Sequence, residues 1–131
     1  MIDHVTIGVR DYESAKRFYA GAFAPLGFAV TLDWRDRKRA YLALPGEPSS
    51  LWLVQSEDRR GVALSLAAGD RATVDEFHAA ATANGGTTIA PPGPRPAYTA
   101  ATYGAEVLDP DGNVLEVVCR QTDSRAVKRA A

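Results

Sequence analysis

One strand–helix unit occurs twice in this chain, and this internal repeat constrains the fold more than any other feature. Residues 4–19 align without gaps with residues 63–78. The matched pairs are Thr6 and Ser65, Asp11 and Asp70, Ser14 and Thr73, Phe18 and Phe77 and, further on, Gly27 and Gly86. A repeated unit predicts two modules that pack as a pseudo-symmetric pair. A pocket between them draws matching positions from each half, and there His4 has Ala63 as its mate.

In the first copy, apolar residues recur with the period of a strand and then with that of a helix. Val5, Ile7 and Val9 alternate with polar or small residues, which predicts a strand over 2–9 with one face against a helix. Asp11 is a favourable N-cap for the helix that follows. The strands predicted after this helix cover residues 28–34, 39–44 and 51–55. The first unit is therefore β-α-β-β-β.

The second copy repeats this order. Asp70 caps a predicted helix that extends to Ala83. We predict a loop for the proline-rich residues 91–96, because proline cannot donate a hydrogen bond inside a sheet. The strands predicted for this copy cover residues 62–68, 87–90, 101–108 and 114–119, with a hairpin turn at 109–113. The pattern predicts an α+β fold of two tandem modules, with module one at 1–57 and module two at 61–120, in one domain over 1–120. Residues 121–131 form a polar, alanine-rich tail, either frayed or a short docking helix.

Composition excludes several classes of partner. A formal charge of −1 over 131 residues gives no electrostatic footprint for nucleic acid. No apolar run is long enough to cross a bilayer, and no signal peptide is recognisable, so we expect a cytoplasmic protein without a membrane partner. The single Cys119 cannot form an intrachain disulfide, and we expect it to be a small buried hydrophobe. The charged residues 35–39 and 58–60 are interpreted as solvated.

Two residues are candidates for chemistry. His4 lies on the face of the first strand that points away from the helix, where it either lines a pocket, binds a metal or is simply hydrogen-bonded. Glu116 lies between Val114 and Val118, and a half-buried carboxylate there needs a partner such as a metal, His4 or an arginine. A His4–Glu116 contact would suit a general base, although a structural contact explains the same residues.

A second group of residues is predicted to bind the rest of a ligand. An arginine beside tyrosines can hold a carboxylate or stack on an aromatic molecule, while exposed loop surface is the alternative. Glu106 interrupts the alternation of its strand, so it faces either the pocket or water. The predicted substrate-binding residues are Trp34, Trp52, Ala63, Ser65, Arg95, Tyr98, Tyr103 and Glu106.

Several segments together resemble the vicinal oxygen chelate superfamily, which holds glyoxalase I, bleomycin-resistance proteins and extradiol dioxygenases. The segments are Asp3-His4-Val5, Ala15 to Tyr19, Phe77-His78, and Leu108 to Asn113 followed by Glu116. The resemblance covers almost all of residues 1–120. It implies that the modules form a curved, open, mixed sheet, a cup with helices on its outer face. It also implies a homodimer, since such sheets leave edges that family members cover by pairing.

The resemblance also implies where a metal would bind. Metal-using members place one ligand near the start of the first strand and one on the last strand of each module, positions that map to His4, Trp52, Ala63 and Glu116. An indole and a methyl group cannot coordinate a metal, so His4 and Glu116 form an incomplete site. No cofactor is assigned, and a weakly held divalent metal stays open.

Two classes of function follow. The first is a protein that binds a small organic molecule in the cup, with His4 and Glu116 as polar anchors. The second is a lyase, isomerase or dioxygenase of the glyoxalase type, similar to lactoylglutathione lyase or a dioxygenase. It would use His4 and Glu116 with or without a divalent metal.

Overall fold

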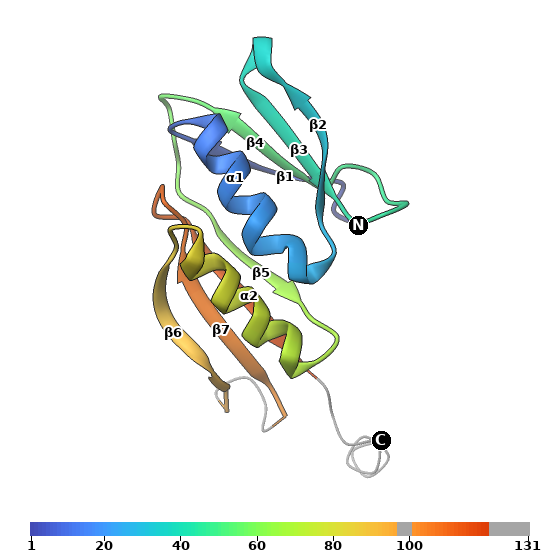
Figure 1. Ribbon diagram of the computed structural model, residues 1–131, viewed down its shortest axis with the longest axis vertical. Coiled ribbons are helices and arrows are strands. Elements are labelled where there is room, and N and C mark those ends of the chain that lie inside the picture. Colours follow the sequence, from blue (N-terminus) through green and yellow to red (C-terminus); the bar gives the residue numbers. More distant parts are fainter. Residues whose placement is uncertain (97–100, 121–131) are drawn as a thin grey trace.

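The computed structural model describes residues 1–96 and 101–120, and these form two modules of the same design (Figure 1). Module one contains β1 (Val5–Val9), α1 (Tyr12–Phe23), η1 (Ala24–Leu26), β2 (Ala29–Trp34), η2 (Arg35–Arg37), β3 (Arg39–Ala43) and β4 (Leu51–Gln55). Module two contains β5 (Ala63–Ala67), α2 (Arg71–Ala83), β6 (Thr87–Pro94), β7 (Tyr103–Leu108) and β8 (Val114–Cys119).

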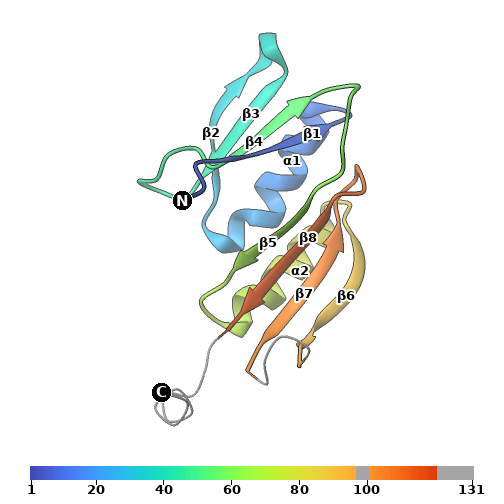
Figure 2. The same ribbon diagram turned by 180° about the vertical axis from the view of Figure 1, so that it is seen from behind.

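Each module builds one four-stranded mixed sheet with the same strand order. The orders are β1-β4-β3-β2 and β5-β8-β7-β6. In both sheets the first pair is parallel and the other pairs are antiparallel. Both helices lie in front of the strands in Figure 1 and behind them in Figure 2, so each sheet has one helix-covered face and one helix-free face. The predicted α+β class with tandem modules and outer helices is confirmed.

Both helices begin at the aspartates that the repeat aligns. The Asp11 side chain accepts a hydrogen bond from the backbone N–H of Ser14, and Asp70 accepts one from that of Thr73. These bonds satisfy donors that a helix start otherwise leaves without a partner. The pKa of both carboxyl groups is lowered, chiefly by the Ser14 hydroxyl at Asp11 and by the Thr73 N–H at Asp70.

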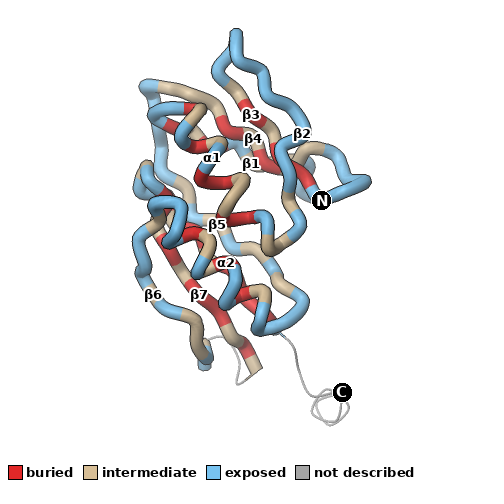
Figure 3. The backbone as a smooth tube through the Cα atoms, in the orientation of Figure 1, coloured by how far each residue is buried: buried red, intermediate tan, exposed pale blue. Residues whose placement is uncertain are grey.

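A single core lies between the helices and the sheets (Figure 3). Ile7 and Val9 are fully buried, as the alternation predicted. The Phe23 and Phe77 rings lie 6.0 Å apart and join α1 to α2 across the modules. Cys119 is buried, as predicted.

A buried polar network also joins the modules. The Tyr19 hydroxyl in α1 donates to Asp109 in the β7–β8 turn. Asp109 further accepts from the N–H groups of Asp111 and Asn113 and from the Asn113 side chain, whose oxygen accepts from Val62 N–H. Burial, and then the Asp109 charge, raise the pKa of Tyr19. The 109–113 segment is the predicted hairpin turn, and it also attaches module two to α1.

The loop prediction for residues 91–96 is wrong for its first part. β6 continues through Pro91 and Pro92 to Pro94, with register shifts at Thr88–Ala90 and Ala90–Gly93. β6 is an edge strand, and an edge strand tolerates prolines because its outer side needs no donors. The predicted tail at 121–131 lies outside the described residues.

Candidate functional site

The sheet of module one carries its polar and aromatic side chains on the helix-free side. Ala40 and Leu53 pair across β3 and β4 and are fully buried. Side chains alternate along a strand and directly opposite residues share a face, so Tyr41 and Trp52 point away from the helix. We call this side the aromatic face. It is formed by His4, Thr6, Gly8, Leu32, Trp34, Arg39, Tyr41, Trp52 and Val54.

Three rings stack across the strands on the aromatic face. The His4 and Trp52 rings are 3.4 Å apart with planes 10° from parallel, and the Trp52 and Tyr41 rings are 4.9 Å apart at 19°. The Trp52 indole N–H donates to the carbonyl of Ser49 at 3.1 Å, which fixes the orientation of the ring. Trp52 is therefore held between two other rings, and the stack presents its edges on the helix-free side.

His4 is oriented by its neighbour in sequence. Its Nδ1 lies 2.8 Å from a carboxylate oxygen of Asp3. The Asp3 side chain is 84% exposed, so the pair adds little to stability, but it determines which ring nitrogen stays available. Nε2 has no hydrogen-bond partner among residues 1–96 and 101–120, so it can contact a ligand.

The sheet of module two presents carboxylates on its helix-free side. Ser65, Glu116 and Glu106 are directly opposite one another on β5, β8 and β7. The Ser65 hydroxyl donates to a Glu116 carboxylate oxygen at 2.7 Å. A hollow of about 260 Å³ lies beside them. We call this side the acidic face; among the residues that line the hollow, Ala63, Ser65, Glu106, Val114 and Glu116 form it.

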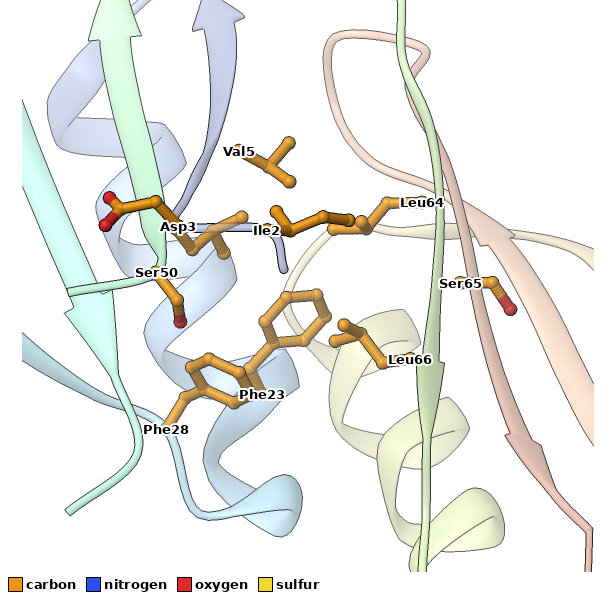
Figure 4. Close-up of a pocket in the computed structure, with 10 residues that line it drawn as sticks. Ile2, Asp3, Val5, Phe23, Phe28, Ser50, Leu64, Ser65 and Leu66 are labelled. Carbon is orange, nitrogen blue, oxygen red and sulfur yellow. The ribbon is translucent and has the colours of Figure 1, made fainter. Parts of the chain in front are cut away.

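A mostly apolar hollow of about 220 Å³ lies where the two modules meet (Figure 4). Leu64 and Leu66 reach into it from β5, opposite Phe23, whereas Ser65 points to the other side of the strand. The N-terminal Ile2 and Asp3 complete its wall. The cavity is thus bordered by Asp3 and Val5, which flank His4 in the sequence, and by Ser65, which is hydrogen-bonded to Glu116.

The structure brings most of the predicted site residues into two groups. His4 and Trp52 lie on the aromatic face, with Trp34 on the outer strand β2 of the same face. Four others lie together on the acidic face: Ala63, Ser65, Glu106 and Glu116. Glu106 thus shares the helix-free side of its sheet with Glu116.

Two predicted residues lie elsewhere. The Arg95 guanidinium donates to the carbonyls of Pro91, Gly93 and Pro94, so it holds its own segment together. The Tyr103 hydroxyl donates to Asp75 on α2, and this bond raises the pKa of Tyr103. The structure therefore turns Tyr103 toward the helix, apart from Glu106. Tyr98 lies outside the described residues.

Comparison with known proteins identifies the family. The model of the Glyoxalase/Bleomycin resistance protein/Dioxygenase superfamily matches residues 1–117. The chain belongs to this superfamily. A glyoxalase/bleomycin resistance protein from Albidiferax ferrireducens T118 is 31% identical, with a TM-score of 0.78 over 90% of this chain and 98% of that one.

Other superfamily structures share the fold at lower identity. A family enzyme from Burkholderia phytofirmans PsJN is 22% identical, with a TM-score of 0.72 over 92% of this chain and 98% of that one. A glyoxalase I mutant from Zea mays is 21% identical, with a TM-score of 0.66 over 93% of this chain and 45% of that one. None of the functionally curated proteins matches the chain. Over the described ranges, no helix is long and apolar enough to span a bilayer.

The superfamily often uses divalent metals, but the four mapped positions offer only two donor side chains in this chain. Of the four mapped positions, Trp52 is stacked between rings and Ala63 has no donor atom. His4 and Glu116 belong to different sheets, and Glu116 accepts from Ser65. Within residues 1–96 and 101–120, no three His, Cys, Asp or Glu side chains are grouped to hold an ion. A firm site needs about three protein ligands.

Two features were missed by sequence reasoning. Arg39 was interpreted as solvated, yet it is half-buried and lies on the aromatic face, opposite Val54. The alternation of 39–43 contains that signal, because Arg39 has the same parity as Tyr41. The Tyr19–Asp109 contact joins residues 90 apart, and periodicity contains no signal for it.

Proposed function

We propose that this superfamily member binds a small organic molecule between its aromatic and acidic faces, with a degenerate metal position. The observation that carries the proposal is that equivalent positions of the two modules have different side chains. In module one Trp52 pairs with Thr6, whereas at the equivalent position of module two Glu116 pairs with Ser65. An aromatic stack favours a flat apolar group, while Ser65 and the carboxylates favour hydrogen-bond donors.

Calorimetric titration with a neutral bicyclic probe, 2-naphthamide, tests this proposal. Trp52→Leu is expected to weaken binding about tenfold, because it removes the central ring of the stack. Tyr103→Leu is the matched control, since it removes a ring that contacts α2, and it should leave the affinity within about twofold. Absence of binding in the wild-type protein, or equal losses in both variants, would contradict the proposal.

An enzyme of the glyoxalase type, acting as a lyase, isomerase or dioxygenase with or without a divalent metal, is the second candidate. The Asp3–His4 contact favours it, because a carboxylate that orients an imidazole is the arrangement of a general base. Turnover of the glutathione–methylglyoxal hemithioacetal that is lost in both His4→Gln and Glu116→Gln would support it. Turnover unaffected by both substitutions would contradict it.

We also propose that the protein is a homodimer. Leu32 and Trp34 are 43% and 39% exposed on the aromatic face, although both are large and apolar. Exposed apolar side chains at the edge of a sheet are commonly covered by a second copy. Light scattering coupled to gel filtration is expected to give twice the chain mass, and a monomer at all concentrations would contradict this proposal.

A further inference from the structure

A second row of side chains lies next to the stacked rings on the aromatic face. Gly8, Val54, Arg39 and Trp34 are directly opposite one another on β1, β4, β3 and β2. This row is displaced by two residues along each strand from the row that contains Trp52 and Tyr41. The displacement corresponds to roughly 7 Å. A flat molecule of bicyclic size is long enough to span both rows.

Arg39 brings a cation into this second row. Its side chain is half-buried, and among the described residues it makes no ion pair. The Arg37 guanidinium lies over the ring of its neighbour Trp34, 4.4 Å from the ring centre. Arg37 is thus engaged with a ring, whereas the Arg39 guanidinium keeps its charge available for a ligand.

Arg59 adds a second cation at the other end of the row. A Cβ atom at Gly8 would lie 3.6 Å from Cγ of Arg59, so the Arg59 stem lies against β1 on the aromatic face. Its guanidinium donates to the carbonyl of Ser56 at 3.1 Å, which holds it near the end of β4. Arg59 also borders a polar hollow of about 350 Å³ with Arg10 and Glu57.

The charges of the two faces are therefore opposite. Glu106 and Glu116 lie on the acidic face, whereas Arg39 and Arg59 lie on the aromatic face. Arg39 on β3 lies two strands, about 10 Å, from Gly8 on β1, and Arg59 lies against Gly8, so the two long side chains can converge on one anion. The planar fork of a guanidinium matches the two oxygens of a carboxylate.

We propose that the ligand is a flat, ring-containing carboxylate. This inference rests on the proposed binding function and names its ligand class. The ring lies along Trp52, Tyr41 and Leu32, and the carboxylate lies in the second row, where Arg39 donates to it and Arg59 adds a further positive charge.

Titration with two matched probes tests the inference. 2-Naphthoate and 2-naphthamide share a ring and differ in charge. Naphthoate is expected to bind the wild-type protein about tenfold more tightly, as for a hydrogen bond to a charged group. Arg39→Met keeps an apolar stem and is expected to bring the ratio close to one. Arg59→Met is expected to lower the ratio by about threefold, because that guanidinium is more exposed.

Two controls keep the outcomes separate. Arg17→Met removes the same charge from α1, on the helix side, and should preserve the ratio. Arg39→Lys keeps the charge without the fork and should give an intermediate ratio, which covers the case in which Arg39→Met does not fold. Equal affinities of the two wild-type complexes, or a ratio unchanged in both Arg39 variants, overturn the inference. If the arginine variants change the oligomeric state but not the ratio of the two affinities, the inference is also overturned, because the arginines then contact a second copy of the chain. If neither probe binds, the proposed function itself fails.

Discussion

The two modules share a backbone and a core but differ in what their helix-free faces present. In module one the central row contains Thr6, Trp52 and Tyr41, and in module two the equivalent row contains Ser65, Glu116 and Glu106. The small hydroxyl side chain of the first strand is kept, whereas two aromatic rings correspond to two carboxylates. The rows that face the proposed ligand therefore differ in chemistry, although the strand order and the register around them are the same in both modules.

The largest expected effects test the shared core. Phe18 and Phe77 are matched in the repeat and are 1% and 0% exposed. Phe18→Ala and Phe77→Ala are each expected to lower the free energy of unfolding by roughly 3–5 kcal/mol. Urea denaturation at neutral pH measures both. Losses that differ by more than about 2 kcal/mol would show that the two cores are not equivalent.

The next prediction concerns a matched pair that the fold uses differently. Tyr19 aligns with His78, but Tyr19 bonds the buried Asp109 of the other module, while His78 bonds Thr88 within its own. Tyr19→Phe is expected to cost about 1–3 kcal/mol, because it leaves a buried acceptor without its donor. His78→Phe is expected to cost less than about 1 kcal/mol, since its bond is exposed to water.

Alkaline pH separates these two variants further. The folded-state pKa of Tyr19 is raised by burial and by Asp109, so above a pH of about 10 the unfolded chain loses a proton that the folded chain keeps. Stability is then lost as the pH rises. Tyr19→Phe should show a shallower loss than the wild-type protein, and His78→Phe should match the wild-type slope. Equal slopes in all three proteins would contradict the buried contact.

A smaller effect contrasts the two faces directly. Like charges directly opposite in a sheet destabilise it, so Glu106→Gln is expected to raise the free energy of unfolding by about 0.2–1 kcal/mol. Tyr41→Leu at the equivalent position of module one is expected to lower it by about 0.5–1.5 kcal/mol through the lost stacking on Trp52. Thermal denaturation at low salt measures both stability changes. Changes in the same direction in both variants would contradict the difference between the two faces.

The smallest effect tests the two caps. The folded-state pKa of Asp11 and of Asp70 is lowered, so the stability that each contributes is present above its ordinary pKa of 3.8 and is lost as the pH falls below it. Asp11→Asn and Asp70→Asn keep a good cap and should leave the melting temperature at pH 7 nearly unchanged. Each substitution should make the fall in melting temperature toward acid pH shallower, and by a similar amount. A shallower fall in only one of the two variants would show that the two caps do not contribute equally.

Much of the fold could be predicted because the sequence encodes it locally. The aspartate caps and the alternation of Val5, Ile7 and Val9 act within a few residues. The continuation of β6 through Pro91 could not be predicted, because a strand's position at the edge of a sheet is a property of the whole topology. The Tyr19–Asp109 bond depends on how the modules pack, which periodicity within one module does not specify.

The site was predictable in part for the same reason. Strand parity placed Glu116 on one face with Val114 and Val118, but its hydroxyl partner Ser65 comes from another strand through the sheet register. Parity also distinguishes Arg39 from the other charged residues of 35–39, because within its strand Arg39 lies on the same face as Tyr41. Nearness in sequence does not predict a shared site for Arg95 and Tyr103. Arg95 lies in the proline-rich segment and Tyr103 follows it, yet the Tyr103 hydroxyl donates to Asp75 on α2.

The chain contains two tryptophans, Trp34 and Trp52, and their indole N–H signals in an NMR titration with 2-naphthamide, whose amide N–H groups can donate to the acidic face, test the central claim most directly. The ligand is expected to shift the Trp52 signal together with the backbone amides of β3, β4 and β8, because the molecule lies between the aromatic and acidic faces. The amides of α1 and α2 should stay unchanged. Shifts confined to the helices, or a Trp52 signal that does not move at saturating probe, would contradict the account.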